Sequence, residues 1–302
     1  MKITNPVYYD LKKNRLVSNK NIEIISKETR DSNVNVLKDK KEKIIFLAKH
    51  ITGTTYYSDV KNHDKRSINN KSKKKINHVL TKKGNIKTTY LEDDERRKKK
   101  LQKLFKGKDI IDYGCGWGNF LKKLKGVKSK NGVEVGMDFI KYLNKKKIKV
   151  KKNILNNNFN FDYITLFHVL HYLPNQIEIL KILRSKLKKN GKVIIEVPNA
   201  NDFLLSSDKF KFFRKFTFCK EQLILHTEKS LKLFVKKAGF KNIKIEFYQR
   251  YNINNHFGWF LHNKPGGHTF LKNLFDSKII KNYSNFLIKK KITDTLILTA
   301  SK

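Results

Sequence analysis

The chain has 302 residues, a formal net charge of +42 and only two cysteines, Cys115 and Cys219. Its length suffices for one large α/β domain with an elaboration, and such a core needs neither disulfides nor metals. Neither cysteine belongs to a cluster with metal-ligand spacing, so we expect no disulfide and no metal site. No segment has the apolar run of a signal peptide or the roughly 18 apolar residues of a membrane span. We therefore expect a cytoplasmic protein without a membrane span.

The basic residues are almost all lysines, and they are spread over every segment. Only eight of the 68 Lys and Arg residues are Arg, although specific phosphate recognition depends on arginine forks as well as on lysine. The excess therefore favours a solvated lysine surface over a nucleic-acid groove, which is the alternative interpretation of such a charge. A positive field of this size also favours an anionic small substrate.

The first hundred residues carry no motif with evident chemistry. Short mixed strands such as NIEIIS and KIIFLAKHITG predict a small N-terminal extension over residues 1–60, to which the sequence assigns no role. Residues 61–100 are expected to form a polar connector that leads into a helix. In that helix, within TTYLEDDERRKKKLQKLFKGK, acids precede bases, and Leu101, Leu104 and Phe105 have helical spacing.

Residues 101–302 form the main domain, in which strands and helices alternate as in a parallel sheet covered by helices. An amphipathic helix at 227–240 follows the alternating part. Residues 252–293, rich in aromatic residues, His and Gly, form an insertion between the last two strands. The expected strands are 109–114, 131–135, 147–154, 161–170, 192–199, 240–251 and 294–301.

The segment DIIDYGCGWGNF, residues 109–120, places three glycines at alternate positions directly after the first strand. Glycine there permits a tight turn and lets a ligand lie on the backbone, with amide N–H groups facing its negative end. Asn119 stands where the dinucleotide fingerprint has its last glycine, which argues against NAD or FAD. About twenty residues further on, Glu134 ends the second strand, where a carboxylate can accept hydrogen bonds from both ribose hydroxyls of a ligand.

With these residues the chain resembles the class I S-adenosylmethionine-dependent methyltransferases, in which DxGxGxG closes the first strand and an acid closes the second. The resemblance implies a Rossmann-like α/β fold with a mostly parallel seven-stranded sheet, an antiparallel last strand and helices on both faces. It also implies that Asp112 and the glycines surround the methionine part of S-adenosylmethionine, that Glu134 binds the ribose, and that Asn153 and Ile154 flank the adenine. The expected cofactor contacts are Asp112, Tyr113, Gly114, Cys115, Gly116, Gly118, Glu134, Val135, Asn153, Ile154, Phe167 and His168.

The end of the fourth strand, LFHVLHYLPN, supplies a further candidate. Ligands bind at the carboxyl edge of such a sheet, so His168 is expected to contact them directly. Similar methyltransferases often read HVLEHL here, whereas this chain has His171 and Tyr172 in place of Glu and His. The candidates for a catalytic base are His168, His256 and His268.

The second half of the chain is similar to bacterial methyltransferases associated with surface-polysaccharide and sugar-nucleotide pathways. The similarity covers the chain from about residue 88 to the end and includes IIEVPNAND, QRYNINNHFGWF and NKPGGH. Arg250 can fork onto a phosphate or carboxylate, and Trp259 can stack under a sugar ring. Alternatively, QRY caps the sheet and PGGH is only a turn. The expected acceptor-binding residues are Asn199, Arg250, His256, Trp259 and His268.

Methyl transfer is an in-line displacement for which a protein supplies alignment, exclusion of water and, where needed, a base. We expect an S-adenosylmethionine-dependent methyltransferase, without a metal, that acts on a small sugar-related or anionic acceptor such as a nucleotide sugar. The charge leaves an RNA methyltransferase open as an alternative. The altered LHY sequence leaves open a catalytically inactive S-adenosylmethionine-binding scaffold. An oxidoreductase ranks last because of the GxGxG spacing.

Overall fold

The computed structural model describes residues 2–51, 79–80, 86–87, 93–157 and 159–302. The chain divides into two compact units, one made of Met1–Ile51 and Leu166–Lys302 and the other of Thr52–Thr165. The N-terminal segment is thus grouped with the second half of the chain, which the sequence did not predict. Most of the predicted connector lies outside the described residues.

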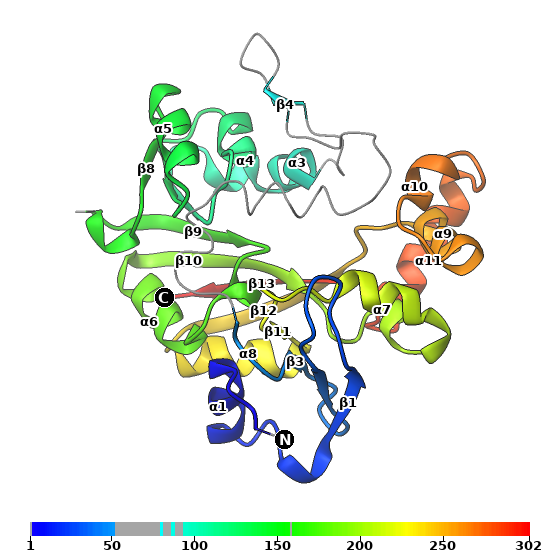
Figure 1. The fold of residues 1–302 in the computed structure, drawn as a ribbon. Coiled ribbons are helices and arrows are strands. Elements are labelled where there is room, and N and C mark those ends of the chain that lie inside the picture. The colour runs from blue at the N-terminus through cyan, green and yellow to red at the C-terminus, as the bar shows by residue number, and fades with distance from the viewer. Residues whose placement is uncertain (1, 52–78, 81–85, 88–92, 158) are drawn as a thin grey trace. The chain divides into compact units, whose positions relative to one another are not determined.

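The main sheet has seven strands in the order β12-β13-β10-β9-β6-β7-β8 (Figure 1). Strand β6 is parallel to β7 and β9, and β7 is parallel to β8. Strand β13 is antiparallel to both of its neighbours, β10 and β12. This arrangement confirms the predicted Rossmann-like fold with a reversed last strand. The strands are β6 Asp109–Tyr113, β7 Ser129–Val133, β8 Lys149–Lys151, β9 Phe161–Phe167, β10 Leu187–Pro198, β12 Lys241–Tyr248 and β13 Thr295–Ser301.

The central strands are buried on both faces, as their continuous apolar sequences require. Consecutive residues of β6, Ile110 and Ile111, are completely buried although their side chains point to opposite faces of the sheet. The same holds for Ile194 and Ile195 of β10, at 2% and 0% exposure. Two acids, Asp112 and Glu196, interrupt these buried runs, and buried acids of this kind require specific partners.

The helices that alternate with these strands follow the predicted apolar periodicity. Helix α5 buries Phe139, Ile140 and Leu143, which lie on one face because of their spacing. Helix α8 begins at a capping box between Thr227 and Ser230. Helix α4 has only five residues, because the chain turns to an extended conformation at the buried Leu124. The helices are α3 Asp93–Phe105, α4 Asn119–Lys123, α5 Met137–Lys145, α6 Gln176–Ser185 and α8 Glu228–Lys237.

A second, antiparallel sheet is built mainly from the N-terminal segment, in the order β1-β2-β3-β11. The Asn5 side chain donates hydrogen bonds to the carbonyl oxygens of Leu47 and Leu223, both at 2.8 Å. Residues 1–51 therefore share one sheet and buried hydrogen bonds with the second half of the chain. The elements are α1 Pro6–Lys13, β1 Ile22–Ser26, β2 Val36–Asp39, β3 Ile45–Leu47 and β11 Ile224–Leu225, while β4 Val79–Leu80 pairs with β5 Ile86–Lys87.

The predicted insertion is helical. Gly258 and Gly267 allow close contact between its first two helices, because a Cβ added to Gly258 would lie 2.7 Å from the Cα of Gly267. No helix within the described part of the chain is long and apolar enough to span a membrane. The insertion comprises α9 Ile253–His262, α10 Gly267–Phe270 and α11 Ser277–Lys289, and the short helix α7 Lys211–Thr217 precedes α8 (Figure 1).

Candidate functional site

The loop after β6 has backbone geometry that glycine adopts most readily. Gly114, Gly116 and Gly118 have φ values of 75°, 50° and 62°, in the left-handed region where other residues are strained. A Cβ added to Gly116 would meet nothing within 4 Å, whereas one added to Gly118 would lie 2.6 Å from Leu143 Cδ2. Gly118 is thus required for packing, and Gly116 leaves a bare backbone surface on which a ligand can lie.

Glu134, directly after β7, links this glycine loop to the start of α5. Its carboxylate is buried and accepts three backbone hydrogen bonds. Oε2 accepts from Gly116 N–H at 2.8 Å, and Oε1 accepts from Val135 and Gly136 N–H at 2.7 and 3.1 Å. A carboxylate offers about four acceptor positions, so Glu134 retains capacity for a ligand hydroxyl while its orientation is fixed.

Asp112 is a buried acid at the end of β6. Burial raises its pKa to about 7. The Thr165 hydroxyl opposes this rise by donating to Oδ1 at 2.6 Å, and the positive charge of Arg97 opposes it as well. A carboxyl whose pKa lies near neutrality changes its charge according to what binds beside it.

Cys115 lies inside the glycine loop, and its side chain packs on β7. A Cβ added to Gly132 of that strand would lie 2.6 Å from Cys115 Sγ. Burial raises the pKa of the Cys115 thiol well above its ordinary value, which makes the residue a packing group and a poor nucleophile. The sequence analysis missed Gly132, whose only signal was a glycine inside the strand NGVEV.

The other predicted cofactor contacts of this unit lie at the ends of strands. Tyr113 and Val135 are half-buried. Asn153 is exposed, and its side chain caps a 3₁₀ turn by accepting a hydrogen bond from Leu155 N–H at 3.0 Å. Ile154 is 2% exposed, so its side chain belongs to the core of the unit.

Two features of this unit fit S-adenosylmethionine. The open space above Gly116 would be filled by a Cβ but admits a ligand, and the fixed carboxylate of Glu134 suits a ribose with free hydroxyls. Asp112 adds a buried carboxyl that, when ionised, can attract a positively charged group of the ligand. The residues present therefore match the donor chemistry that the sequence predicted.

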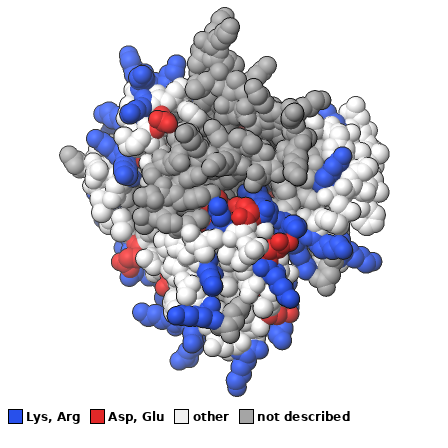
Figure 2. All heavy atoms as spheres, in the orientation of Figure 1, with Lys and Arg blue, Asp and Glu red and all other residues white. Residues whose placement is uncertain are grey.

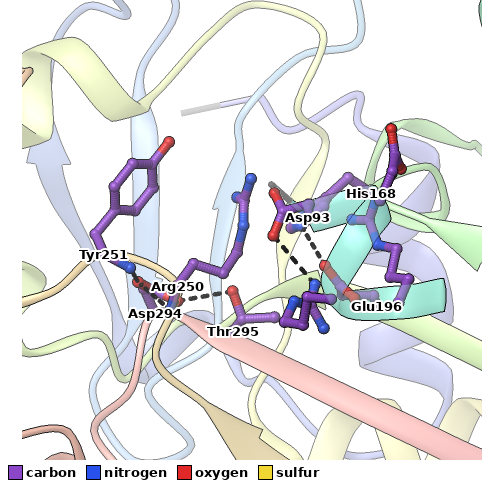
Figure 3. A network of polar contacts seen from close by, with 10 residues as sticks. Asp93, His168, Glu196, Arg250, Tyr251, Asp294 and Thr295 are labelled. Carbon is purple, nitrogen blue, oxygen red and sulfur yellow. Dashed lines mark hydrogen bonds and ion pairs between the residues drawn. The ribbon is translucent and has the colours of Figure 1, made fainter. Parts of the chain in front are cut away.

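Phe167 is the last residue of β9, His168 follows it, and both belong to the other unit. His168 has a φ of 56°, which is uncommon for a residue with a side chain. Its backbone N–H donates to the Glu196 carbonyl oxygen at 2.8 Å, and its Nε2 lies 3.0 Å from Glu196 Oε1 (Figure 3). Glu196, on β10, is almost completely buried, so its carboxylate holds the imidazole in one orientation. The sequence analysis missed Glu196, although an acid inside the apolar run VIIEVP was a usable signal.

His256, on α9, is buried within a polar network. Gln249 Oε1 accepts from Asp294 N–H at 3.1 Å, so its Nε2 faces His256 Nε2 at 3.2 Å. His256 Nε2 is therefore an acceptor, and Nδ1–H donates to Tyr283 Oη at 2.8 Å. Burial lowers the pKa of His256 to about 4. With both nitrogens engaged, the ring stacks on Phe203, with centroids 5.7 Å apart, which favours a structural role.

Asp294, directly before β13, is the centre of this network. Its carboxylate accepts from the backbone N–H groups of Arg250 and Tyr251, from Gln249 Nε2, and from the Thr295 hydroxyl (Figure 3). Burial raises the pKa of Asp294, and the Arg250 charge, the two backbone N–H groups and the Thr295 hydroxyl oppose that rise. The Asp294 carboxylate therefore fixes the conformation of the turn after β12.

The Tyr251 side chain, in the same turn, lies between two residues that were predicted to bind the methyl acceptor, Arg250 and His268. The Arg250 guanidinium lies 5.3 Å from the Tyr251 ring centroid, and the His268 ring centroid lies 5.6 Å from it. His268 Nδ1 lies 3.3 Å from Asn255 Oδ1, so the nitrogen Nδ1 carries the proton. Partial burial lowers the pKa of His268. We call Arg250, Tyr251, Asn255 and His268 the Tyr251 site; the sequence analysis missed Tyr251 as a member.

The remaining predicted acceptor residues lie in buried contacts of their own. Asn199 is 1% exposed; its Nδ2 donates to Thr293 O, and its Oδ1 accepts from Asn201 N–H. Trp259 is 4% exposed and packs against Phe213 and Phe216 of α7. This packing favours structural roles for both residues. Among the described residues, no group of three or more His, Cys, Asp or Glu side chains is arranged to hold a metal ion.

The fold and the glycine loop with its following acid define a Rossmann-like domain of the kind that binds S-adenosylmethionine. Residues 90–245, just over half of the chain, match the family model described as "Methyltransferase domain". The chain therefore belongs to this methyltransferase-domain family. Family and fold together support S-adenosylmethionine as its cofactor.

Two curated relatives are tRNA U34 carboxymethyltransferases. The protein from Campylobacter fetus is 30% identical over 156 residues, which cover 46% of this chain and 53% of the relative. The protein from Pseudoalteromonas translucida is 25% identical over 161 residues, which cover 47% of each chain. The chain thus spans about half the length of these relatives.

Solved structures share the fold at low sequence identity. Phosphoethanolamine N-methyltransferase 2 of Haemonchus contortus, in complex with S-adenosyl-L-methionine, aligns with a TM-score of 0.50 at 15% identity and covers 85% of this chain and 61% of its own. An S-adenosylmethionine-dependent methyltransferase from Archaeoglobus fulgidus aligns with a TM-score of 0.46 at 22% identity and covers 69% of this chain and 94% of its own.

Proposed function

We propose that this protein transfers a methyl group from S-adenosylmethionine to a small anionic acceptor, and that a nucleotide sugar is the class to test first. The observation that carries the donor half is the glycine loop, whose open Gly116 is hydrogen-bonded to the buried Glu134. Membership of the methyltransferase-domain family supports the same assignment.

The residues of the donor unit supply alignment. When bound, S-adenosylmethionine supplies an already activated methyl carbon. The backbone at Gly116 positions the ligand, and the Glu134 carboxylate accepts from its hydroxyls while three amides keep that carboxylate in place. Holding reactants in one geometry accounts for a large share of the rate in such displacements, so the chain needs no nucleophile of its own.

The Tyr251 site is the proposed place of the acceptor. Arg250 offers a planar fork that suits phosphate or carboxylate, and the Tyr251 ring offers an apolar surface against which a sugar can pack. In His268, Nδ1 faces Asn255 Oδ1, so Nε2 is the unprotonated nitrogen. Because partial burial lowers the pKa of His268, the ring stays neutral at physiological pH and suits the role of base.

The donor assignment is tested first, by calorimetric titration with S-adenosylmethionine, its demethylated product and NADH. We expect micromolar binding of the first two ligands and none of NADH. Glu134→Ala should weaken binding by at least tenfold, because it removes a fixed carboxylate and its hydrogen bonds to the ligand, which are worth about 1.5–3 kcal/mol each when charged. Asp138→Ala, which removes an exposed acid in the next helix, is the matched control. Failure of the wild type to bind would contradict the assignment.

A tRNA acceptor is the second candidate, because two relatives are tRNA U34 carboxymethyltransferases and the net charge is +42. If the chain shared their reaction, the transferred group would be carboxymethyl. Figure 2 shows the lysines and arginines of the visible face in several groups with uncharged residues between them. Nucleic-acid binding more often uses one continuous basic stripe.

The two acceptors differ in what they predict for salt. Binding to tRNA should fall steeply with added salt, as counterions are released, and label from the donor should enter RNA. A small acceptor predicts label in the small-molecule fraction and loss of turnover in Arg250→Lys, which keeps the charge but removes the fork. Nucleoside mass analysis distinguishes methyl from carboxymethyl transfer.

A further inference from the structure

The helical insertion carries an unusual concentration of exposed apolar side chains. Phe260 and Leu261 of α9 are 65% and 54% exposed, and Phe257 one turn earlier is 36% exposed. Phe270 and Leu274, which follow on α10 and in the loop after it, are 44% and 50% exposed. We call these five residues the apolar face of the insertion. Soluble monomers rarely expose contiguous apolar surface of this kind unless it binds something.

Aromatic contacts within the insertion join parts of this face. Phe257 lies 6.5 Å from Phe260 and 4.8 Å from Phe275 between ring centroids. Phe270 lies 5.5 Å from the His262 ring at the end of α9. Phe257, Phe260 and Leu261 have the spacing that places side chains on one side of a helix. Helices α9 and α10 also touch through their glycines, which makes the face a built feature of the insertion.

The charge around this face is one-sided. Residues 252–290 contain six lysines, all of them exposed, and a single acid, Asp276, whereas the whole chain has 68 basic and 26 acidic residues. Asp276 is engaged as the N-cap of α11, where it accepts from Ile279 N–H at 2.8 Å. On the face drawn in Figure 2, no red side chain covers these helices.

We propose that the apolar face of the insertion docks on an anionic lipid surface. Phenylalanine and leucine side chains that protrude between lysines are the composition of interfacial membrane anchors, in which apolar groups enter the acyl boundary and lysines meet anionic headgroups. Exposed aliphatic residues argue against a nucleic-acid surface, where stacking aromatics are joined by arginine; residues 252–290 contain no Arg. A second copy of this chain would bring lysines against lysines. The inference is independent of methyl transfer.

The test is sedimentation of the full chain with vesicles of phosphatidylcholine alone and with phosphatidylglycerol added. The wild type should bind the anionic vesicles only. The variant Phe260→Ser/Leu261→Ser changes only exposed positions and keeps the net charge. Vesicle binding that depends only on the excess of lysines would therefore be the same in this variant as in the wild type. Loss of the two apolar side chains should weaken vesicle binding by roughly tenfold or more, since each of them would otherwise move apolar surface out of water on docking.

Tyr9→Ser/Ile24→Ser is the matched control, because it removes one aromatic and one aliphatic side chain that are 57% and 49% exposed elsewhere in the same unit. It should bind as the wild type does. The proposal is overturned if the wild type stays in the supernatant or if the two double variants bind equally. It is also overturned if light scattering finds a wild-type dimer that Phe260→Ser/Leu261→Ser dissociates, or if that variant loses tRNA binding and keeps vesicle binding.

Discussion

Gly116 shows at the scale of single residues how a ligand site differs from a packing site. Its φ of 50° and the empty space at its Cβ position leave the backbone bare. Gly107 has the same two properties, with a φ of 70° and nothing within 4 Å, but it lies in the turn between α3 and β6, at the opposite end of β6 from the glycine loop. Substitutions at Gly116 and Gly107 can therefore distinguish the loss of stability caused by a strained backbone from the loss of affinity caused by filling a ligand site.

Gly116→Ala and Gly107→Ala should therefore lower the free energy of unfolding by similar amounts, about 1–2 kcal/mol for a left-handed alanine. Only Gly116→Ala should also weaken S-adenosylmethionine binding, by tenfold or more, because its methyl group occupies the space above the loop. Thermal unfolding and calorimetric titration measure the two effects. Equal binding by both variants would show that the ligand does not lie on Gly116.

Gly132 illustrates the opposite case, in which the space is already filled. A methyl group there would lie 2.6 Å from Cys115 Sγ and 3.2 Å from Val150 Cγ2. Gly132→Ala should destabilise the protein by about 1–3 kcal/mol through overpacking. Adding Cys115→Ala should recover part of this loss, since the closest atom is then gone. A double-mutant cycle in urea measures the coupling, and a coupling near zero would contradict the packing described above.

At the scale of elements, the insertion is fastened by the hydrogen bond from His256 Nδ1–H on α9 to Tyr283 Oη on α11. Tyr283→Phe leaves the buried Nδ1–H without an acceptor, which should cost about 1–3 kcal/mol of stability. Tyr9→Phe is the control, because it removes an exposed hydroxyl that donates to Ile3 O at 3.2 Å, and it should change stability by less than about 0.5 kcal/mol. Chemical unfolding compares the two, and equal effects would refute the fastening role.

Elements also differ in how well the sequence predicted them. The alternation of strands and helices and the glycine loop were predictable, since each depends on spacing within a few residues. The reversed last strand was implied by the family resemblance. The buried network was not, because Gln249 and Asp294 are 45 positions apart and His256 and Tyr283 are 27 apart. Of the residues expected to bind the methyl acceptor, Arg250 and His268 both lie beside Tyr251. The surroundings of Asn199 and Trp259 depend on tertiary packing, which a local sequence pattern cannot predict.

At the scale of the whole molecule, Asp202 should contribute a part of the stability that falls as the pH rises from about 4 to 8. Burial raises the pKa of Asp202 to about 8, and the nearby charge of Asp294 adds to this rise. Between the ordinary carboxyl pKa and that value, the folded protein holds a proton that the unfolded chain has released, so raising the pH favours unfolding. Each pKa unit corresponds to about 1.4 kcal/mol.

Asp202→Asn should flatten this pH dependence and stabilise the protein at pH 8. Asparagine can still accept the hydrogen bond that Asp202 Oδ1 receives from Leu204 N–H at 2.9 Å, so the turn itself is preserved. The control Asp276→Asn changes an exposed capping acid and should leave the slope unaltered. Melting temperatures across the pH range decide the matter, and a wild-type slope in Asp202→Asn would refute the assignment.

The pairing of β3 with β11 also governs how the protein can be made. Ile45 and Phe46 pair with Leu225 and Ile224. At a synthesis rate of about 5–20 residues per second, these partners are made roughly 9–35 s later. Until then, the edge of the N-terminal sheet is open, and Val36 and Leu47 lack Phe218 and Leu225, their partners in one apolar cluster. The nascent chain thus carries an unsatisfied strand through most of its synthesis, when a holding chaperone would matter most.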